Sequence, residues 1–115
     1  VEVTADTHLW ARSLEVLEAD GLPVVAFPQS AARMTPATQR FTQMALERQL
    51  THDGNPALSR HVSNAVLKSD ARGTRIYKEN KASQRKIDLA VAAIMGLERA
   101  MAFVETPADP VPQFF

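Results

Sequence analysis

The chain has 115 residues, of which 45% are hydrophobic and 23% are charged, a composition typical of one globular unit with a modest core. Because it has no cysteine, it can form no disulfide, thiolate metal site or cysteine nucleophile, and a reducing compartment is permitted. No apolar run approaches the roughly 20 residues that span a bilayer, and residues 1–6 lack the features of a signal peptide. We therefore expect one soluble domain.

A strand, a helix and a second strand are predicted first. Val1–Ala5 alternates apolar and polar residues and Val24–Phe27 is a short apolar run, so both suit strands. Asp6 or Thr7 can cap the helix between them, and Asp20-Gly21 can end it. Its apolar residues recur at helical spacing: Leu9, Trp10, Leu14 and Leu17. A connection of this length favours parallel strands with a right-handed crossover.

Two further helices are predicted from their capping signals. Thr35-Pro36 places a capping hydroxyl before a proline at the first helical position, and the helix should end in the segment Thr51–Gly54. Its predicted apolar stripe is Phe41, Met44, Ala45 and Leu50. Asn55-Pro56 repeats the cap and proline signal, which predicts a shorter helix to about Asn64.

A hairpin and a long helix complete the predicted order. Val66–Lys68 and Thr74–Tyr77 flank Ser69–Gly73, a pattern typical of a hairpin or an extended arm. Ser83 can cap the last helix, whose apolar face is Ile87, Ala90, Val91, Ile94, Leu97 and Met101. The prolines beyond Val104 predict a loose tail.

Basic residues gather in one stretch of the chain although the formal net charge is zero. The stretch contains only two acids, Asp70 and Glu79, against seven basic residues: Lys68, Arg72, Arg75, Lys78, Lys81, Arg85 and Lys86. Two interpretations stay open, a solvated loop and hairpin or a positive surface that holds nucleic acid.

Two carboxylates are the main candidates for chemistry. Asp6 follows the first predicted strand, at the edge where α/β sheets present functional groups, although an aspartate there can also be a helix cap. Asp88 lies in the second turn of the last predicted helix, too far from its start for the helix dipole to explain it, and its alternative is an exposed surface acid. Together they could bind Mg²⁺ or Mn²⁺, which prefer carboxylate oxygens.

The other sequence motifs exclude several enzyme classes. His8, His52 and His61 have no zinc-binding spacing, so all three are interpreted as structural or surface residues, although His52 could approach a phosphate or a water at the scissile bond. The chain has no phosphate-binding GxxxxGK[ST] loop, no GxGxxG and no GxSxG. Neither an ATP site nor a serine hydrolase is predicted.

Five segments in order resemble the nuclease domain of terminase large subunits of tailed phages and prophages. They are Gly21–Val25, Met34–Pro36, His52–Leu58, Val62–Ala65 and Lys86–Ala92, and the resemblance extends from Asp6 to about Phe103. The resemblance implies a partial ribonuclease H-like fold of the α/β class, with a short mixed sheet flanked by helices and a long C-terminal helix. Residues 1–104 would form this part of the nuclease domain and 105–115 a flexible proline-rich tail.

The same resemblance implies site residues and partners. Asp6 and Asp88 would be catalytic residues that bind two divalent ions, Mg²⁺ or Mn²⁺. With these ions the enzyme would hydrolyse phosphodiester bonds of concatemeric DNA. The predicted contacts to double-stranded DNA are Arg72, Arg75, Lys78, Lys81 and Lys86. Portal and small terminase subunit would be partners, in the cytoplasm of a bacterial host and transiently at the procapsid, with no membrane involved.

Some features of the terminase family have no match in this sequence, and two other interpretations of its function stay open. The family's first acid and its motor ATPase have no match here, so the isolated chain is expected to bind metal weakly and to cut little DNA. One rival is another ribonuclease H-like nuclease of the resolvase or integrase type. The other is a non-catalytic docking module for portal or motor partners, in which Asp6 and Asp88 are ordinary surface acids.

Overall fold

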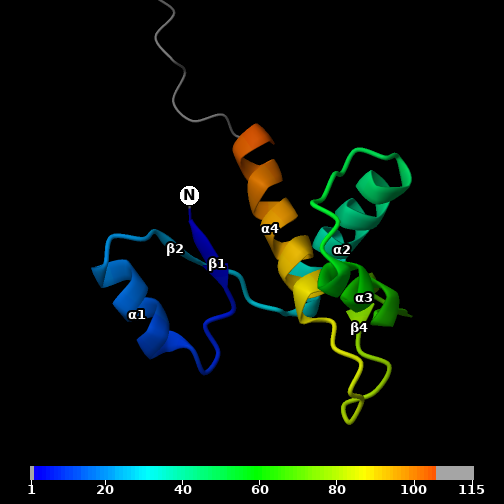
Figure 1. Ribbon diagram of the computed structural model, residues 1–115, viewed down its shortest axis with the longest axis horizontal. Coiled ribbons are helices and arrows are strands. Elements are labelled where there is room, and N and C mark those ends of the chain that lie inside the picture. Colours follow the sequence, from blue (N-terminus) through cyan, green and yellow to red (C-terminus); the bar gives the residue numbers. More distant parts are fainter. Residues whose placement is uncertain (1, 106–115) are drawn as a thin grey trace, which may run out of the picture.

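Four helices and four strands lie within residues 2–105, the part of the chain that the computed structural model describes. In order they are β1 (Val3–Ala5), α1 (Ala11–Ala19), β2 (Val24–Ala26), α2 (Ala31–Leu46), α3 (Pro56–Asn64), β3 (Val66–Asp70), β4 (Gly73–Tyr77) and α4 (Asp88–Glu105). The long helix α4 runs through the middle, with β1, α1 and β2 on one side and α2, α3 and the β3–β4 hairpin on the other (Figure 1). The predicted α/β class is confirmed.

The first strand, helix and strand form as the sequence predicts. β1 and β2 pair in parallel, with Val3 opposite Val24 and Ala5 opposite Ala26. α1 ends in a Schellman motif, in which the Leu22 N–H donates to the Leu17 carbonyl oxygen and Gly21 adopts a φ of 91°. The predicted stop at Asp20-Gly21 is therefore confirmed.

The predicted beginning of this helix is wrong. α1 begins only at Ala11, and its N-cap residue, Trp10, makes no side-chain capping hydrogen bond. Asp6 instead folds the preceding turn, since its Oδ1 accepts from the His8 N–H. Leu9 and Trp10, expected on the buried face, precede the helix and are 90% and 61% exposed.

The second helix begins earlier than predicted and includes its proline. Its cap is Ser30, whose hydroxyl accepts from the Arg33 N–H, so Pro36 lies inside α2 rather than at its first position. The helix ends at Leu46, so Leu50 lies beyond it, while Ala45 is exposed and Phe41 and Met44 are half-buried. The buried positions lie in the first half of α2: Met34, Thr35, Ala37 and Thr38.

The third helix and the hairpin agree with the prediction, but the strands do not form one mixed sheet. Asn55 caps α3 by accepting from the Ala57 and Leu58 N–H groups, and Pro56 is its first residue. β3 and β4 pair only with each other, antiparallel, so the described residues contain two separate two-stranded sheets.

The hairpin folds back against α2 instead of extending as an arm. A Cβ on Gly73 would lie 2.7 Å from the Thr35 Cγ2 and 3.1 Å from the Gln39 Nε2, so the strand passes closer to α2 than any other residue type would allow. This packing buries Thr35 and Thr38 of α2. Because threonine is polar, the sequence has no apolar pattern that predicts the burial of these two positions.

The last helix begins at Asp88, five residues after the predicted cap. Ser83 instead stabilises a turn in the preceding segment, where its hydroxyl accepts from the Arg85 N–H and donates to Glu79. α4 continues to Glu105, one residue past the predicted domain boundary, and the remainder of the predicted tail, 106–115, lies outside the described residues. None of the helices within 2–105 combines the length and hydrophobicity needed to cross a bilayer.

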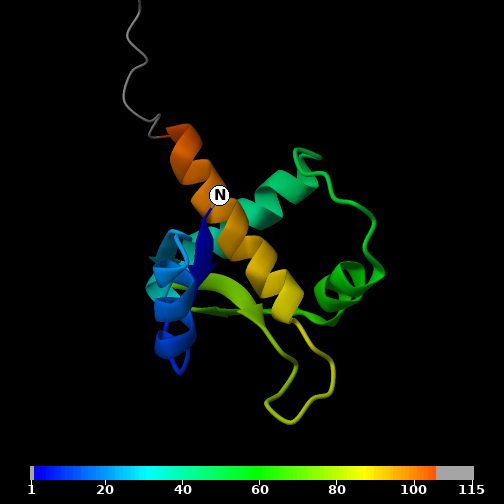
Figure 2. The ribbon, with the colours of Figure 1, turned by 60° about the vertical axis from the view of Figure 1, so that its left-hand side comes forward.

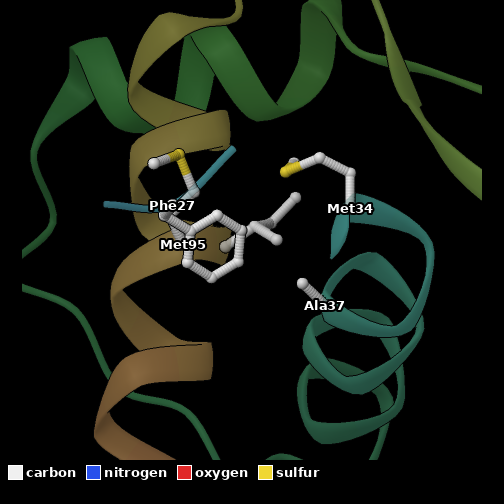
Figure 3. Close-up of a cluster of buried hydrophobic side chains, with 5 residues drawn as sticks. Phe27, Met34, Ala37 and Met95 are labelled. Atoms are coloured by element: carbon white, nitrogen blue, oxygen red, sulfur yellow. The ribbon is translucent and has the colours of Figure 1, made fainter. Parts of the chain in front are cut away.

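The core lies between α2 and α4 and is closed by Phe27, the residue after β2. It consists of Phe27, Met34, Ala37, Ile94 and Met95. Figure 3 shows Met34 and Ala37 on α2 facing the side chains of Phe27 and Met95. Phe27 is fully buried, at 0% exposure, so the first unit is joined to the rest of the molecule through this ring.

Candidate functional site

Asp6 and Asp88 line one cavity. The cavity has a volume of about 900 Å³ and lies between β1, the turn that follows it and one face of α4. Its apolar wall includes Leu14, Val91 and Met95, and its polar lining includes His8, Gln29 and Lys78. The fold thus places the two acids that the sequence singled out on the lining of one cavity, which also includes one of the predicted basic contacts, Lys78.

Asp6 is held by backbone groups at the end of the parallel sheet. Its Oδ1 accepts from the His8 N–H at 3.0 Å and its Oδ2 from the Gln29 N–H at 3.4 Å. The His8 bond lies within the turn that follows β1, whereas the Gln29 bond joins this turn to the segment after β2, because the carboxyl ends of parallel strands meet at one edge. Each carboxylate oxygen keeps a further lone pair, so the group can still coordinate a cation.

Asp88 is the first residue of α4 and is exposed. The helix dipole places partial positive charge at this end and favours a carboxylate within the first turn. The expected second-turn position is therefore wrong, and the dipole accounts for the acid at this place. Its neighbour Ile87 is buried, which anchors the peptide that carries Asp88.

Gln29 is a lining residue that sequence reasoning missed. Its backbone donates to Asp6, and its side-chain amide donates to the Met95 sulfur at 3.7 Å. It thereby connects the edge of the parallel sheet to α4. The available signal was its place just past the second parallel strand, at the same edge as Asp6.

The predicted DNA-binding residues separate into different environments. Lys78 lines the cavity, whereas Lys81 and Lys86 are exposed on the segment 78–87, which projects away from the body of the molecule (Figure 2). Arg72 is at the tip of the hairpin, where its side chain is 69% exposed and lies 3.8 Å from the Asp70 carboxylate.

Arg75 is the exception among these basic residues. Its guanidinium donates to the Asp70 Oδ2 at 2.8 Å and its side chain is only 13% exposed. This bond holds the pKa of Asp70 below its ordinary value and raises that of Arg75. The structure therefore assigns Arg75 to the stability of the hairpin, contrary to its expected position on a free arm.

His52 does not join the two acids. It lines a different cavity, of about 570 Å³, together with Phe41, Leu58 and Leu97. Its Nδ1 accepts from the Gly54 N–H at 3.0 Å, so it organises the turn before α3. The sequence-based suggestion that it approaches a scissile water near the acids is not supported by this placement.

The donor set suits a hard cation but is small. Carboxylate oxygens are preferred ligands of Mg²⁺ and Mn²⁺, and Asp6 and Asp88 provide them on the walls of the same cavity. Within residues 2–105 no group of three or more His, Cys, Asp or Glu side chains is placed to hold a metal ion. Asp6 and Asp88 stand on a cavity lining that is mainly apolar, and the third carboxylate there, Glu2, is paired with Arg99.

The fold and this cavity define an α/β domain in which one carboxylate follows a parallel strand, another begins a helix, and both line one cavity. The family model "Terminase large subunit, endonuclease domain" matches residues 6–103, and the chain belongs to this family. The predicted resemblance is thereby confirmed.

A solved structure gives independent support. The HK97 bacteriophage large terminase is similar, with a TM-score of 0.71 and 26% identity over 86% of this chain. The match covers 21% of the HK97 protein, so this chain spans about a fifth of that enzyme. No curated protein matches the chain.

Proposed function

We propose that this chain supplies Asp6 and Asp88 as metal ligands to the endonuclease that cuts double-stranded DNA during viral packaging. The observation that carries the proposal is that both carboxylates line one cavity in a domain of the terminase endonuclease family. This shared location favours a nuclease over a docking module with scattered surface acids. The family match favours a terminase over a resolvase or integrase.

In this proposal the acidic residues of the cavity would bind the metal and a basic residue would bind the phosphate. Terminase nuclease domains in general depend on divalent metals. A bound Mg²⁺ or Mn²⁺ would supply activation of a water molecule and stabilisation of the charge on the leaving oxygen. Asp6 and Asp88 would hold the metal, and Lys78, which lines the same cavity, would bind the phosphate that is cut.

Metal binding by the 115-residue chain tests the two acids. Because the third carboxylate of the cavity, Glu2, is paired with Arg99, and no group of three acids within residues 2–105 is placed to hold a metal, we expect weak Mn²⁺ binding and little cleavage of plasmid DNA. In NMR spectra, Mn²⁺ should broaden the signals of residues around the cavity, and Asp6→Asn or Asp88→Asn should each abolish this broadening. Glu18→Gln, an exposed change on α1, is the matched control. Broadening that persists in both aspartate variants would contradict the proposal, and robust cutting by the wild-type chain would contradict the expected weak activity.

DNA binding tests the basic residues separately. Replacing Arg72, Lys78, Lys81 and Lys86 with glutamine should weaken binding and flatten its salt dependence by about 0.9 in logarithmic slope for each phosphate that is no longer neutralised. Arg12→Gln on α1 should leave the slope unchanged, since this exposed residue is not one of the predicted DNA contacts. An unchanged slope in the fourfold variant would remove DNA binding by these residues from the proposal.

In the full-length enzyme, the proposed partners are double-stranded DNA, the portal and the small terminase subunit. The proposed setting is the cytoplasm of a bacterial host, with transient attachment at the procapsid.

A further inference from the structure

The beginning of α4 is tied to α3 by two side-chain hydrogen bonds. The imidazole Nδ1 of His61 accepts from the Leu89 N–H at 2.9 Å. The side-chain amide of Asn64 donates to the Lys86 carbonyl oxygen at 2.9 Å. Because His61 and Asn64 are three residues apart, they share one face of α3. Their partners, Lys86 and Leu89, lie on the two sides of Asp88 in the sequence.

The His61 bond satisfies a group that α4 cannot satisfy itself. Leu89 is the second residue of the helix, and the first four N–H groups of any helix have no partner within it. Capping normally comes from a serine, threonine, aspartate or asparagine just before the helix, and Lys86 and Ile87 cannot provide it. An imidazole from another helix takes that place here. To accept at Nδ1, the ring must carry its proton on Nε2.

These bonds matter to the packing of α3 because this helix has no fully buried residue. A helix without buried side chains gains little from the hydrophobic effect, so polar bonds contribute much of what places it against α4. Conversely, the peptide that carries Asp88 is held on both sides by α3. His61 itself does not line the cavity of the two acids.

We propose that His61 is a positioning residue that fixes the first turn of α4 and thereby the direction of the Asp88 carboxylate. Asp88 is exposed, and within residues 2–105 no side-chain hydrogen bond or ion pair holds its carboxylate. Its orientation therefore depends on the backbone of this turn. The role in metal binding rests on the proposed function, whereas the capping of Leu89 does not.

Two isosteric substitutions separate capping from general stability. In His61→Asn the side-chain oxygen occupies the position of Nδ1 and can still accept from Leu89. In His61→Gln the oxygen corresponds to Nε2 and points elsewhere, although glutamine is the better helix former. His61→Leu removes the acceptor. A merely structural role would therefore rank glutamine at or above asparagine, whereas capping ranks asparagine above glutamine.

The experiment is NMR on the 115-residue chain. We expect the wild-type ¹⁵N spectrum of His61 to show the Nε2–H tautomer, and Leu89 amide exchange to become roughly fivefold faster in His61→Gln and His61→Leu, the factor of a typical hydrogen bond. The Asp88 carboxyl ¹³C signal should shift in these two variants, and His61→Asn should restore both readouts. The proposal would be overturned if either the exchange rate of the Leu89 amide or the Asp88 carboxyl ¹³C signal is unchanged in both His61→Gln and His61→Leu.

Mn²⁺ added to the same samples separates this inference from the proposed function. Broadening around Asp88 that weakens in the glutamine and leucine variants and returns in the asparagine variant supports both. If the wild-type chain shows no broadening while Leu89 and Asp88 still respond as expected, the metal site fails and the positioning of Asp88 by His61 stands.

Discussion

Single residues acquire different roles according to the backbone around them. The sequence predicted that the last helix begins after Ser83, which would put Asp88 in its second turn. The helix in fact begins at Asp88, and in this first-turn position the helix dipole favours the negative charge of the carboxylate. Asp6 likewise could cap a helix, yet it bonds the ends of two neighbouring strands instead. For both acids, the residue type and its position in the sequence were enough to select it as a candidate. Which groups surround its carboxylate was decided by the conformation of the neighbouring backbone.

One ion pair gives a pH-dependent prediction at this scale. Arg99 donates from Nε to the Glu2 Oε1 at 2.5 Å and from Nη2 to Oε2 at 3.1 Å, which joins the start of the chain to α4. The bond holds the pKa of Glu2 below its ordinary value of 4.5. Its contribution is therefore complete above pH 4.5 and is lost as the pH falls through the lowered pKa.

Urea unfolding at a series of pH values measures this effect. Glu2→Gln should be less stable than the wild type at pH 7, and the difference should shrink as the pH falls. Glu18 makes no ion pair with any residue in the described range 2–105, so Glu18→Gln should follow the wild-type curve. A constant difference between Glu2→Gln and wild type across the acid range would show that the ion pair does not contribute in this way.

At the scale of elements, capping signals predicted the beginning of some helices and not of others. Asn55-Pro56 begins α3 as expected, since Asn55 accepts from two N–H groups of the helix while Asp53 accepts from the Asn55 N–H in the preceding turn. Thr35-Pro36 gives the same signal, but Ser30 caps α2 earlier and the proline is accommodated inside the helix. Ser83 likewise does not cap α4, because its hydroxyl stabilises a turn with Glu79 and Arg85.

Two glycines in different surroundings are predicted to respond in opposite ways to replacement by alanine. Gly73→Ala should destabilise the protein by ~2 kcal/mol, because φ is +122° and the new Cβ would meet Thr35 Cγ2 at 2.7 Å. Gly96→Ala should stabilise it by about 0.5–1 kcal/mol, because this glycine is inside α4 and a Cβ added there would meet no atom within 4 Å. Thermal and urea unfolding measure both, and equal effects would contradict the packing described.

At the scale of the whole molecule, α4 joins two parts of unequal packing. α2, α3 and the hairpin all pack on one another or on α4, whereas α1 packs mainly on β2. α1 has one buried residue, Leu14, and no side-chain cap. Sparse burial lowers the free energy of local opening, so α1 is the element expected to open first.

Amide hydrogen exchange tests this ranking. We expect the amides of α1 to exchange at least about tenfold faster than those in the middle of α4, which is buried at Ala90, Ile94 and Met95. Phe27→Ala should abolish the difference in protection by opening the core, at a cost of about 3–5 kcal/mol. Equal protection of α1 and α4 in the wild-type chain would show that α1 is held by packing other than that with β2.

The sequence by itself determined the order of the elements, the parallel pair at the start, the cap of α3, the hairpin and the apolar face of the last helix. These features depend on propensity, capping and periodicity, which act within a few residues. Only the tertiary structure decided where α2 and α4 begin, that Thr35 and Thr38 are buried, that Arg75 is paired with Asp70, and that the strands form two sheets. It also decided that Asp6 and Asp88 share a cavity, since this depends on how elements far apart in the chain pack around Phe27 and Met95.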